Sequence, residues 1–248
     1  MNALLDLSDD TRANTLVALL AKQLRPGGVV ATGVVSPLAI LAIATARATH
    51  APDLSYLACV GSLDPELNTL ERSTEDLVYL QGRRAEVSIA DLFDHAIRGR
   101  VDTVFFGAVE VDGAGRSNMS AIGGLTRPKV KFPGVAGASS LRRWVKRPVL
   151  LVTHHSLRSL VPAVQVASTS DERPTLLITN LAVFEVGGPT GATLLGLHPW
   201  SSEAEVAAKT GFSYATSPGL EFTEAPSEAT VDAIRAFDSL NLRQSLVG

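Results

Sequence analysis

Residues 26–48, PGGVVATGVVSPLAILAIATARA, decide the fold and carry no charge before their last two positions. An uncharged run of this length could form a transmembrane helix. However, its first half is rich in β-branched valine, its second half is rich in alanine and leucine, and glycines and a proline interrupt it. This pattern favours a buried strand over residues 28–35 and then a helix. Ser36 is expected to cap that helix and Pro37 to open it, and it should end near Ala48.

The same alternation of strand and helix continues along the chain. Further strands are predicted for LSYLACV (54–60), VDTVFFGAVEVD (101–112), RPVLLVTHH (147–155) and PTLLITNLAVFEV (174–186). Two further helices are predicted from Ser8 to about Leu24 and from Ser227 to Phe237. Two others should begin with capping boxes: one after Ser88, with Asp91, and one after Ser202, with Glu205, which should end at Gly211. We therefore predict a single α/β domain over residues 1–248, with an open, mainly parallel sheet flanked by helices.

The composition excludes several classes of protein. The 248 residues are 46% hydrophobic and 19% charged, with a net charge of −3, which gives no sign of nucleic-acid or membrane binding. The start of the chain lacks a cationic segment followed by an apolar one, so no signal peptide is expected. A single cysteine allows no internal disulfide and suits a reducing cytoplasm. We expect a cytoplasmic protein without a metal site.

The lone cysteine, Cys59, lies in APDLSYLACVGSLD (51–64), where a predicted strand ends. Open α/β sheets bind ligands beyond the carboxyl ends of their strands, so this is a candidate site. A nucleophilic cysteine needs a nearby base, and no triad signature connects it to His50, His95, His154, His155 or His198. The alternative is a small buried hydrophobic side chain. His154 and His155 end a strand, where they are either site residues or solvated loop residues.

Residues 113–140 form a long glycine-rich segment, and a loop of that length is usually functional. Within it, GVAGASS (134–140) could let backbone N–H groups approach a ligand and point at one oxygen. A tight structural turn would explain the same glycines. Asn118, in the same segment, either binds a ligand or satisfies its own backbone.

Taken in order, these segments resemble the β subunits of the glutaconate CoA-transferase type. The matching segments are PGGVVATGVVSPLAILA, APDLSYLACVGSLD, GAVEVDGAGRSNMSAIG, RPKVKFPGVAGASS, TNLAVFEV and LHPWSSEAEVAAKTGF. The resemblance implies the open α/β fold of CoA-transferase family I and a CoA thioester as substrate. It also implies an α subunit of the same family as partner, in an α2β2 assembly with the active site between the two kinds of subunit.

Two positions depart from the transferase pattern. Aligning Asp53 and Gly61 with that pattern places Cys59 where the transferases carry the glutamate that accepts CoA, and Glu110 stands where glutamine is usual. A thiol cannot form the mixed anhydride through which that carboxylate works, so ordinary CoA transfer is not expected. A cysteine here resembles the branch that decarboxylates 3-methylglutaconyl-CoA to 3,3-dimethylacrylyl-CoA, without a cofactor, in alternative isovaleryl-CoA biosynthesis.

The resemblance assigns roles residue by residue. The expected catalytic positions are Cys59, Gly137 and Ala138, the latter two as N–H donors to the thioester oxygen. The expected substrate-binding positions are Val60, Gly61, Asn118, Val135 and Ala136. Two alternatives stay open: a CoA-ester hydrolase of the ring-opening type, and a CoA-binding scaffold whose α partner supplies the catalytic carboxylate.

Overall fold

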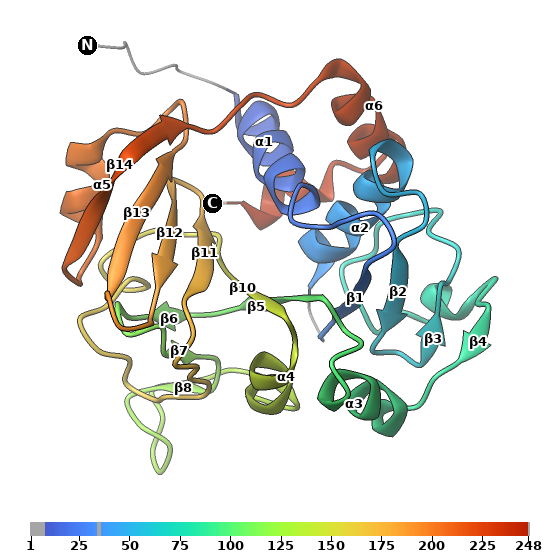
Figure 1. Cartoon of the computed structure of the whole chain (residues 1–248), viewed down its shortest axis with the longest axis horizontal. Coiled ribbons are helices and arrows are strands. Elements are labelled where there is room, and N and C mark those ends of the chain that lie inside the picture. Colours follow the sequence, from blue (N-terminus) through green and yellow to red (C-terminus); the bar gives the residue numbers. More distant parts are fainter. Residues whose placement is uncertain (1–7, 34–35, 248) are drawn as a thin grey trace. The chain divides into compact units, whose positions relative to one another are not determined.

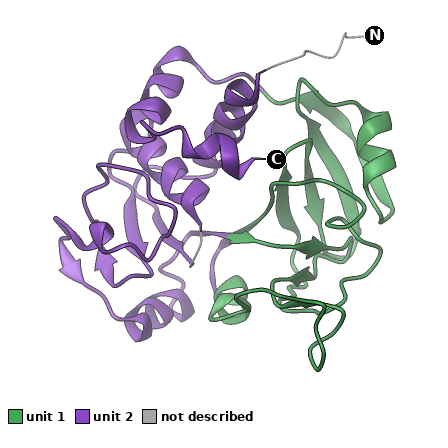
Figure 2. Cartoon of the chain, turned by 180° about the vertical axis from the view of Figure 1, so that it is seen from behind, with its two compact units in different colours: residues 1–7, 106–143, 148–223 green, residues 8–105, 144–147, 224–248 purple. Residues whose placement is uncertain are grey.

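The computed structural model describes residues 8–33 and 36–247 (Figure 1). The last two residues of the first predicted strand, 34 and 35, lie outside the described residues, as do residues 1–7, on which the expectation about a signal peptide rests. Figure 2 shows two compact units: unit 1 contains residues 106–143 and 148–223, and unit 2 contains residues 8–105, 144–147 and 224–248. The chain passes between the units several times, and the single-domain expectation stays a prediction.

Unit 2 carries the first predicted strand–helix segment. Its strands are β1 (Val29–Thr32), β2 (Ser55–Ala58), β3 (Ser62–Leu63), β4 (Ala85–Glu86) and β5 (Thr103–Gly107), the last two residues of which belong to unit 1. Its helices are α1 (Asp9–Ala21), α2 (Pro37–Thr49), α3 (Ile89–Ile97) and α6 (Glu228–Phe237), with short 3₁₀ turns η1 (Leu77–Leu80) and η2 (Leu242–Leu246). β1 pairs in parallel with both β2 and β5, and β3 runs against β2 and β4.

The helix starts of unit 2 follow from their capping residues. The Ser8 hydroxyl accepts from Thr11 N, and Ser88 and Asp91 form both hydrogen bonds of the predicted capping box. Ser36 holds the predicted N-cap position of α2, but its side chain makes no cap hydrogen bond to the helix; its carbonyl accepts from the backbone N–H groups of the first turn. The first helix ends at Ala21, earlier than predicted, because Lys22 already forms the C-cap.

Unit 1 contains a second set of sheet strands and two small hairpins. The sheet strands are β10 (Arg147–Val152), whose first residue belongs to unit 2, β11 (Thr175–Thr179), β12 (Ala182–Val186), β13 (Ala192–Leu197) and β14 (Tyr214–Phe222). The hairpins pair β6 (Glu110–Val111) with β7 (Ser117–Asn118) and β8 (Ala121–Ile122) with β9 (Val130–Lys131). The helices are α4 (Ala138–Trp144), whose last residue belongs to unit 2, and α5 (Glu203–Lys209). β10–β11 and β13–β14 are parallel pairs, and β12 runs against both of its neighbours.

The observed strands confirm the α/β class and the mainly parallel sheet. Among the described strands of that sheet, β3 runs against its neighbours in unit 2 and β12 runs against its neighbours in unit 1. The sequence prediction does not include β13, β14 or α4, and three further details differ from it. The segment 101–112 is two strands, β5 and β6, and the segment 174–186 is a hairpin. The capping box of α5 is half formed: Ser202 accepts from Glu205 N, but the Glu205 carboxylate accepts from Lys209 instead.

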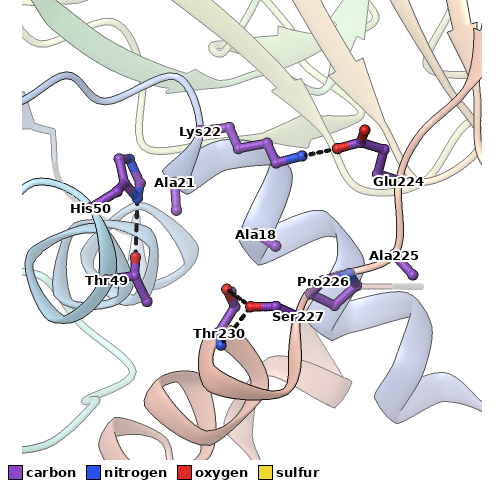
Figure 3. A pocket seen from close by; sticks show the side chains of 10 residues that line it. All are labelled: Ala18, Ala21, Lys22, Thr49, His50, Glu224, Ala225, Pro226, Ser227 and Thr230. Atoms are coloured by element: carbon purple, nitrogen blue, oxygen red, sulfur yellow. Dashed lines mark hydrogen bonds and ion pairs between the residues drawn. The ribbon is translucent and has the colours of Figure 1, made fainter.

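A pocket of about 440 Å³ opens in unit 2 beside the ends of α1 and α2 and the start of α6 (Figure 3). Its polar side chains pair with one another: Lys22 with Glu224 at 2.6 Å, and Ser227 with Thr230 at 2.9 Å. The remaining lining is mainly alanine and proline. None of the described helices has the length and apolar character that a membrane span requires.

Candidate active site

Cys59 directly follows β2, at the carboxyl end of a strand that pairs in parallel with β1. It opens the turn that leads to β3, and Gly61 completes that turn with φ +114°, a conformation that few other residues adopt. We call residues 55–64 the Cys59 hairpin. The prediction that the sulfur lies where a parallel strand ends is confirmed, and the turn places Val60 and Gly61 beside it.

The carboxylate of Asp64 holds the Cys59 hairpin in place. Its Oδ1 accepts from Tyr56 N at 2.7 Å, which closes the hairpin, and from Arg47 of α2 at 2.6 Å. Its Oδ2 pairs with Arg84 at 2.9 Å. Asp64 has φ +48°, which aspartate tolerates better than most residues. The hairpin is therefore fixed to α2 by a side chain that the sequence analysis did not single out.

The surroundings of Cys59 favour a neutral thiol. Sγ lies 3.9 Å from Thr74 Oγ1 and 4.0 Å from Thr74 O, and the Thr74 hydroxyl donates to Gly33 O at 2.8 Å. Burial raises the pKa of Cys59, an effect that the Thr74 hydrogen bond opposes and the charge of Glu75 reinforces. A nucleophilic thiol needs a base or a cation to lower its pKa. The hydroxyl and the carbonyl of Thr74, which Sγ contacts, supply neither.

His155 and His198 are structural residues of unit 1. His155 hydrogen bonds to the hydroxyls of Thr179 and Thr210, both at 2.9 Å, and His198 bonds to Thr223 Oγ1 and Thr179 O, both at 2.8 Å. Burial lowers the pKa of each histidine to about 4, so both are neutral at physiological pH. The interpretation of His155 as a solvated residue is wrong, because these hydroxyls satisfy both ring nitrogens in the interior.

The loop before α4 has the geometry of a strained turn. Ala136 has φ +42°, a conformation that costs a non-glycine residue about 1 kcal/mol or more. Gly134 N donates to Met119 O at 3.1 Å, and Leu141 N donates to Gly137 O at 3.0 Å, where α4 begins. We call residues 134–138 the Gly137 loop. Strain of this kind is often kept where a backbone group has a task, which supports the loop as a candidate site.

The two expected N–H donors of the Gly137 loop differ. Ala138 N donates to Val135 O at 2.8 Å and closes the turn, so that N–H is occupied. Gly137 N has no hydrogen-bond partner among the described residues. Gly137 is therefore the better candidate for an N–H that binds a ligand, because the N–H of Ala138 already donates within the turn. The direction of a backbone N–H cannot be predicted from the residue type.

Asn118 is fully engaged inside unit 1. Its Nδ2 donates to Glu110 Oε2 and to Ala121 O, both at 2.8 Å, and its Oδ1 accepts from Ser120 N at 3.0 Å. This geometry favours the alternative in which Asn118 satisfies its own loop. Glu110, which stands where the transferases usually have glutamine, is buried. Its carboxylate also accepts from Gln165 N and Gln165 Nε2, at 3.0 and 2.9 Å. Asn118 and Glu110 therefore support each other.

The predicted site residues are divided between the compact units. Cys59, Val60 and Gly61 belong to unit 2, whereas Asn118 and residues 135–138 belong to unit 1. None of them lines the pocket of Figure 3. Within residues 8–33 and 36–247, no group of three histidine, cysteine or acidic side chains could hold a metal ion. The chemistry open to these residues is therefore that of a neutral thiol and of backbone amides.

The family model described as Coenzyme A transferase matches residues 13–209, more than half of the chain. The chain belongs to the coenzyme A transferase family. This agrees with the resemblance drawn from the ordered sequence segments.

Individual relatives show which members of the family this chain resembles. The chain is 64% identical to a chain in the crystal structure of the decarboxylase AibA/AibB, covering 96% of this chain and 99% of that one with a TM-score of 0.93. Forms of that decarboxylase with Asn, Ser, Ala or Val in place of a cysteine match with the same TM-score. One of the subunits of 3-oxoadipate CoA-transferase from Pseudomonas knackmussii is 27% identical over 88% of this chain and 90% of its own. The cholesterol ring-cleaving hydrolase IpdB subunit of Mycobacterium tuberculosis is 27% identical over 94% and 97%.

Proposed function

We propose that this chain is the β subunit of a two-subunit decarboxylase that converts 3-methylglutaconyl-CoA to 3,3-dimethylacrylyl-CoA and CO₂. The observation that carries the proposal is the 64% identity to the AibA/AibB decarboxylase over nearly the whole chain, against 27% for the transferase relative. The neutral thiol of Cys59 at the end of β2 supports it, since a protonated thiol is a poor substitute for an acyl-accepting carboxylate.

The proposed reaction uses the substrate as its own electron sink. The bond between the γ carbon and the departing carboxylate breaks, and its electron pair moves through the double bond into the thioester carbonyl. CO₂ leaves, the oxygen becomes that of a dienolate, and a proton added at the γ carbon gives the product. No cofactor is needed for this electron flow. The task of the protein is to stabilise the dienolate oxygen.

We assign that stabilisation to Gly137 N–H, since the N–H of Ala138 is occupied in its turn. One well-placed donor of this kind contributes about 3 kcal/mol to the transition state. Val60, Gly61, Val135 and Ala136 are proposed to line the acyl group. Asn118 is proposed to act indirectly, by holding its loop through Ala121 and Glu110.

We propose that Cys59 shapes the pocket rather than reacting. A carboxylate at this position would repel the carboxylate of the substrate, and the neutral thiol removes that repulsion. An apolar, half-buried sulfur also disfavours the charged substrate carboxylate relative to neutral CO₂. Both effects need the absence of charge and neither needs sulfur chemistry.

The relatives are subunits of two-subunit enzymes, which supports an α partner for this chain. We propose an α2β2 assembly in the cytoplasm, where a free cysteine stays reduced. The substrate is a CoA thioester, and the proposal includes no further cofactor.

The test is a product assay on the complex co-expressed with its α partner. Incubation with 3-methylglutaconyl-CoA should release CO₂ and give a CoA ester lighter by its mass. The hydrolase relative provides the competing outcome, in which free CoA or a C–C cleaved acid is formed while CO₂ is not. If substitutions at Cys59 and Gly137 change only the affinity for CoA esters and leave kcat intact, the chain is instead a scaffold for a site owned by the partner.

A further inference from the structure

Arg142, in the middle of α4, is a buried cation with neutral hydrogen-bond acceptors. Its side chain is fully buried, Nη1 donates to Thr169 Oγ1 at 2.8 Å, and Nη2 donates to Gly115 O at 2.6 Å and to Thr175 Oγ1 at 3.3 Å. Burial lowers the pKa of Arg142 to about 10, so the guanidinium keeps its charge at neutral pH. Burying a cation without a direct carboxylate partner is costly, which makes its placement informative.

The acceptors of Arg142 belong to segments far apart in the sequence. Gly115 ends the turn in which its N–H donates to Asp112 O at 2.9 Å. The Thr169 hydroxyl pairs with Ser117 of β7 at 2.6 Å, and Thr175 begins β11. The planar fork of arginine can hold several acceptors at once in fixed directions. Arg142 therefore fixes α4 to the β6–β7 hairpin, to the segment at residue 169 and to the sheet of unit 1.

A second arginine fastens the far end of the same helix. Arg173 Nη2 donates to Arg142 O at 2.7 Å and to Arg143 O at 3.3 Å, and it pairs with Asp171 at 2.6 Å. The carbonyl groups at the end of a helix lack partners within the helix, so a guanidinium there is stabilising. Helix α4 is thus held both along its buried side and at its end.

The opposite end of α4 carries the Gly137 loop. Ala138 lies one helical turn before Arg142 and on the same face, because residues four apart lie above one another and their side chains lean toward the helix start. Leu141 N also donates to Gly137 O. The strained φ of Ala136 persists only if its surroundings are rigid. Fixing α4 therefore fixes the start of the helix and the loop that enters it.

We propose that Arg142 is a positioning residue that holds helix α4, and with it the N–H of Gly137, in the orientation needed for the reaction. The inference rests on the proposed function and deepens it. A misplacement of 1 Å in a catalytic group can cost about 100-fold in rate, which is why such a support matters. Arg142 touches neither substrate nor reacting atoms in this account.

The experiment compares Arg142→Met and Arg142→Lys in the co-expressed complex. Arg142→Met should lower kcat about 10- to 100-fold with KM within about 3-fold, since orientation and not affinity is lost. Arg142→Lys should recover part of that loss, because it keeps the charge but not the fork. Hydrogen–deuterium exchange should show faster exchange of Ala138 and Leu141 N–H in Arg142→Met. If Arg142→Met does not fold, the same readouts are taken on Arg142→Lys, where a loss of about 3- to 10-fold is expected.

Arg243 of η2 provides the matched control. It is also fully buried, pairs with Asp238 at 2.8 Å, donates to Asn14 at 2.7 Å, and contacts Asp10. Arg243→Met should lower Tm at least as much as Arg142→Met but leave kcat per folded complex and the exchange of residues 134–141 unchanged.

An unchanged kcat in Arg142→Met, with Tm lowered as in the control, would overturn the positioning role and leave a purely structural one. Unchanged exchange at Ala138 and Leu141 would overturn it as well. If the wild-type complex releases no CO₂, the proposed function fails, while the exchange measurement still decides whether Arg142 holds the loop.

Discussion

The Cys59 hairpin and the Gly137 loop are held by opposite means. In the hairpin, a half-buried carboxylate, Asp64, accepts from Arg47 and from the backbone of Tyr56. Behind the loop, a fully buried cation, Arg142 of the helix that follows, donates to the neutral oxygens of Thr169 and Gly115. Their chemistry differs too, since the hairpin presents a side-chain thiol and the loop presents a backbone amide.

The two groups therefore respond differently to substitution: a side-chain thiol can be removed, whereas a backbone N–H can only be displaced. Burial raises the pKa of Cys59, and its sulfur contacts the hydroxyl and the carbonyl of Thr74, so we expect removal of the sulfur to change the shape of the site and little of its reactivity. The N–H of Gly137 stays in every ordinary variant, and its direction depends on the helix behind it. We infer that the function is robust to changes in the hairpin and sensitive to the setting of the loop.

We expect the largest effect from acid, which should destabilise unit 1 more than the Cys59 hairpin. Both buried histidines, His155 and His198, lie in unit 1 with the Gly137 loop. Their folded pKa values of about 4 lie below the ordinary 6.5, so the unfolded state binds protons first as pH falls. Stability is then lost from pH 6.5 down to pH 4, by about 3 kcal/mol for each histidine over the whole window. Urea unfolding at pH 7.5 and 5 measures the loss.

A control for this prediction replaces both rings with amides. In His155→Gln/His198→Gln the difference in stability between pH 7.5 and 5 should shrink, since glutamine does not titrate. Hydrogen exchange at pH 5 should show unit 1 losing protection before the Cys59 hairpin. An equal loss in wild type and double variant would show that other groups dominate the acid response.

An amide-to-ester replacement at Gly137 tests the loop directly. It removes the N–H and keeps the backbone shape, so kcat for CO₂ release should fall about 10²- to 10³-fold if that N–H stabilises the dienolate oxygen. The same replacement at Ala138 is the matched control. It should cost about 1 kcal/mol of stability, because it deletes the bond to Val135 O, and have a smaller effect on kcat. A larger loss of kcat at Ala138 than at Gly137 would contradict our assignment.

Asp64→Asn tests the hairpin. Asparagine tolerates the positive φ but loses the charge that Arg47 and Arg84 face, which should lower the free energy of unfolding by about 2 kcal/mol. Asp94→Asn, which breaks the exposed pair with Arg98, is the control and should cost less than about 0.5 kcal/mol. Chemical denaturation measures both. Equal values for the two variants would mean that Asp64 does not brace the hairpin.

The sequence revealed the features that depend on local residue type. Strand–helix alternation indicated the α/β class, serines marked helix starts, and Gly61 after an apolar run placed Cys59 at a strand end. It did not reveal β14, whose exposed residues include Pro218 and Gly219, both of which usually break strands. Nor did it show the turn that divides β11 from β12 near Asn180, because no glycine or proline marks it.

The features that the sequence did not reveal depend on contacts with residues far away in the chain, which no local sequence pattern encodes. Arg142 meets acceptors 27 and 33 residues away, and a lone arginine in sequence predicts a solvated side chain. The use of Ala138 N–H in a turn depends on backbone angles and not on residue type. His155 looks like an ordinary loop residue until the hydroxyls of Thr179 and Thr210 are placed around it.

The most direct test of the account is the turnover of Cys59→Ala in the co-expressed complex, measured as CO₂ released from 3-methylglutaconyl-CoA. If the neutral thiol shapes the pocket, as we propose, kcat should stay within about 10-fold of wild type, below the range of general acid–base catalysis. A loss of more than about 10³-fold with substrate still bound would show that the sulfur takes part in the chemistry, and the account would be wrong.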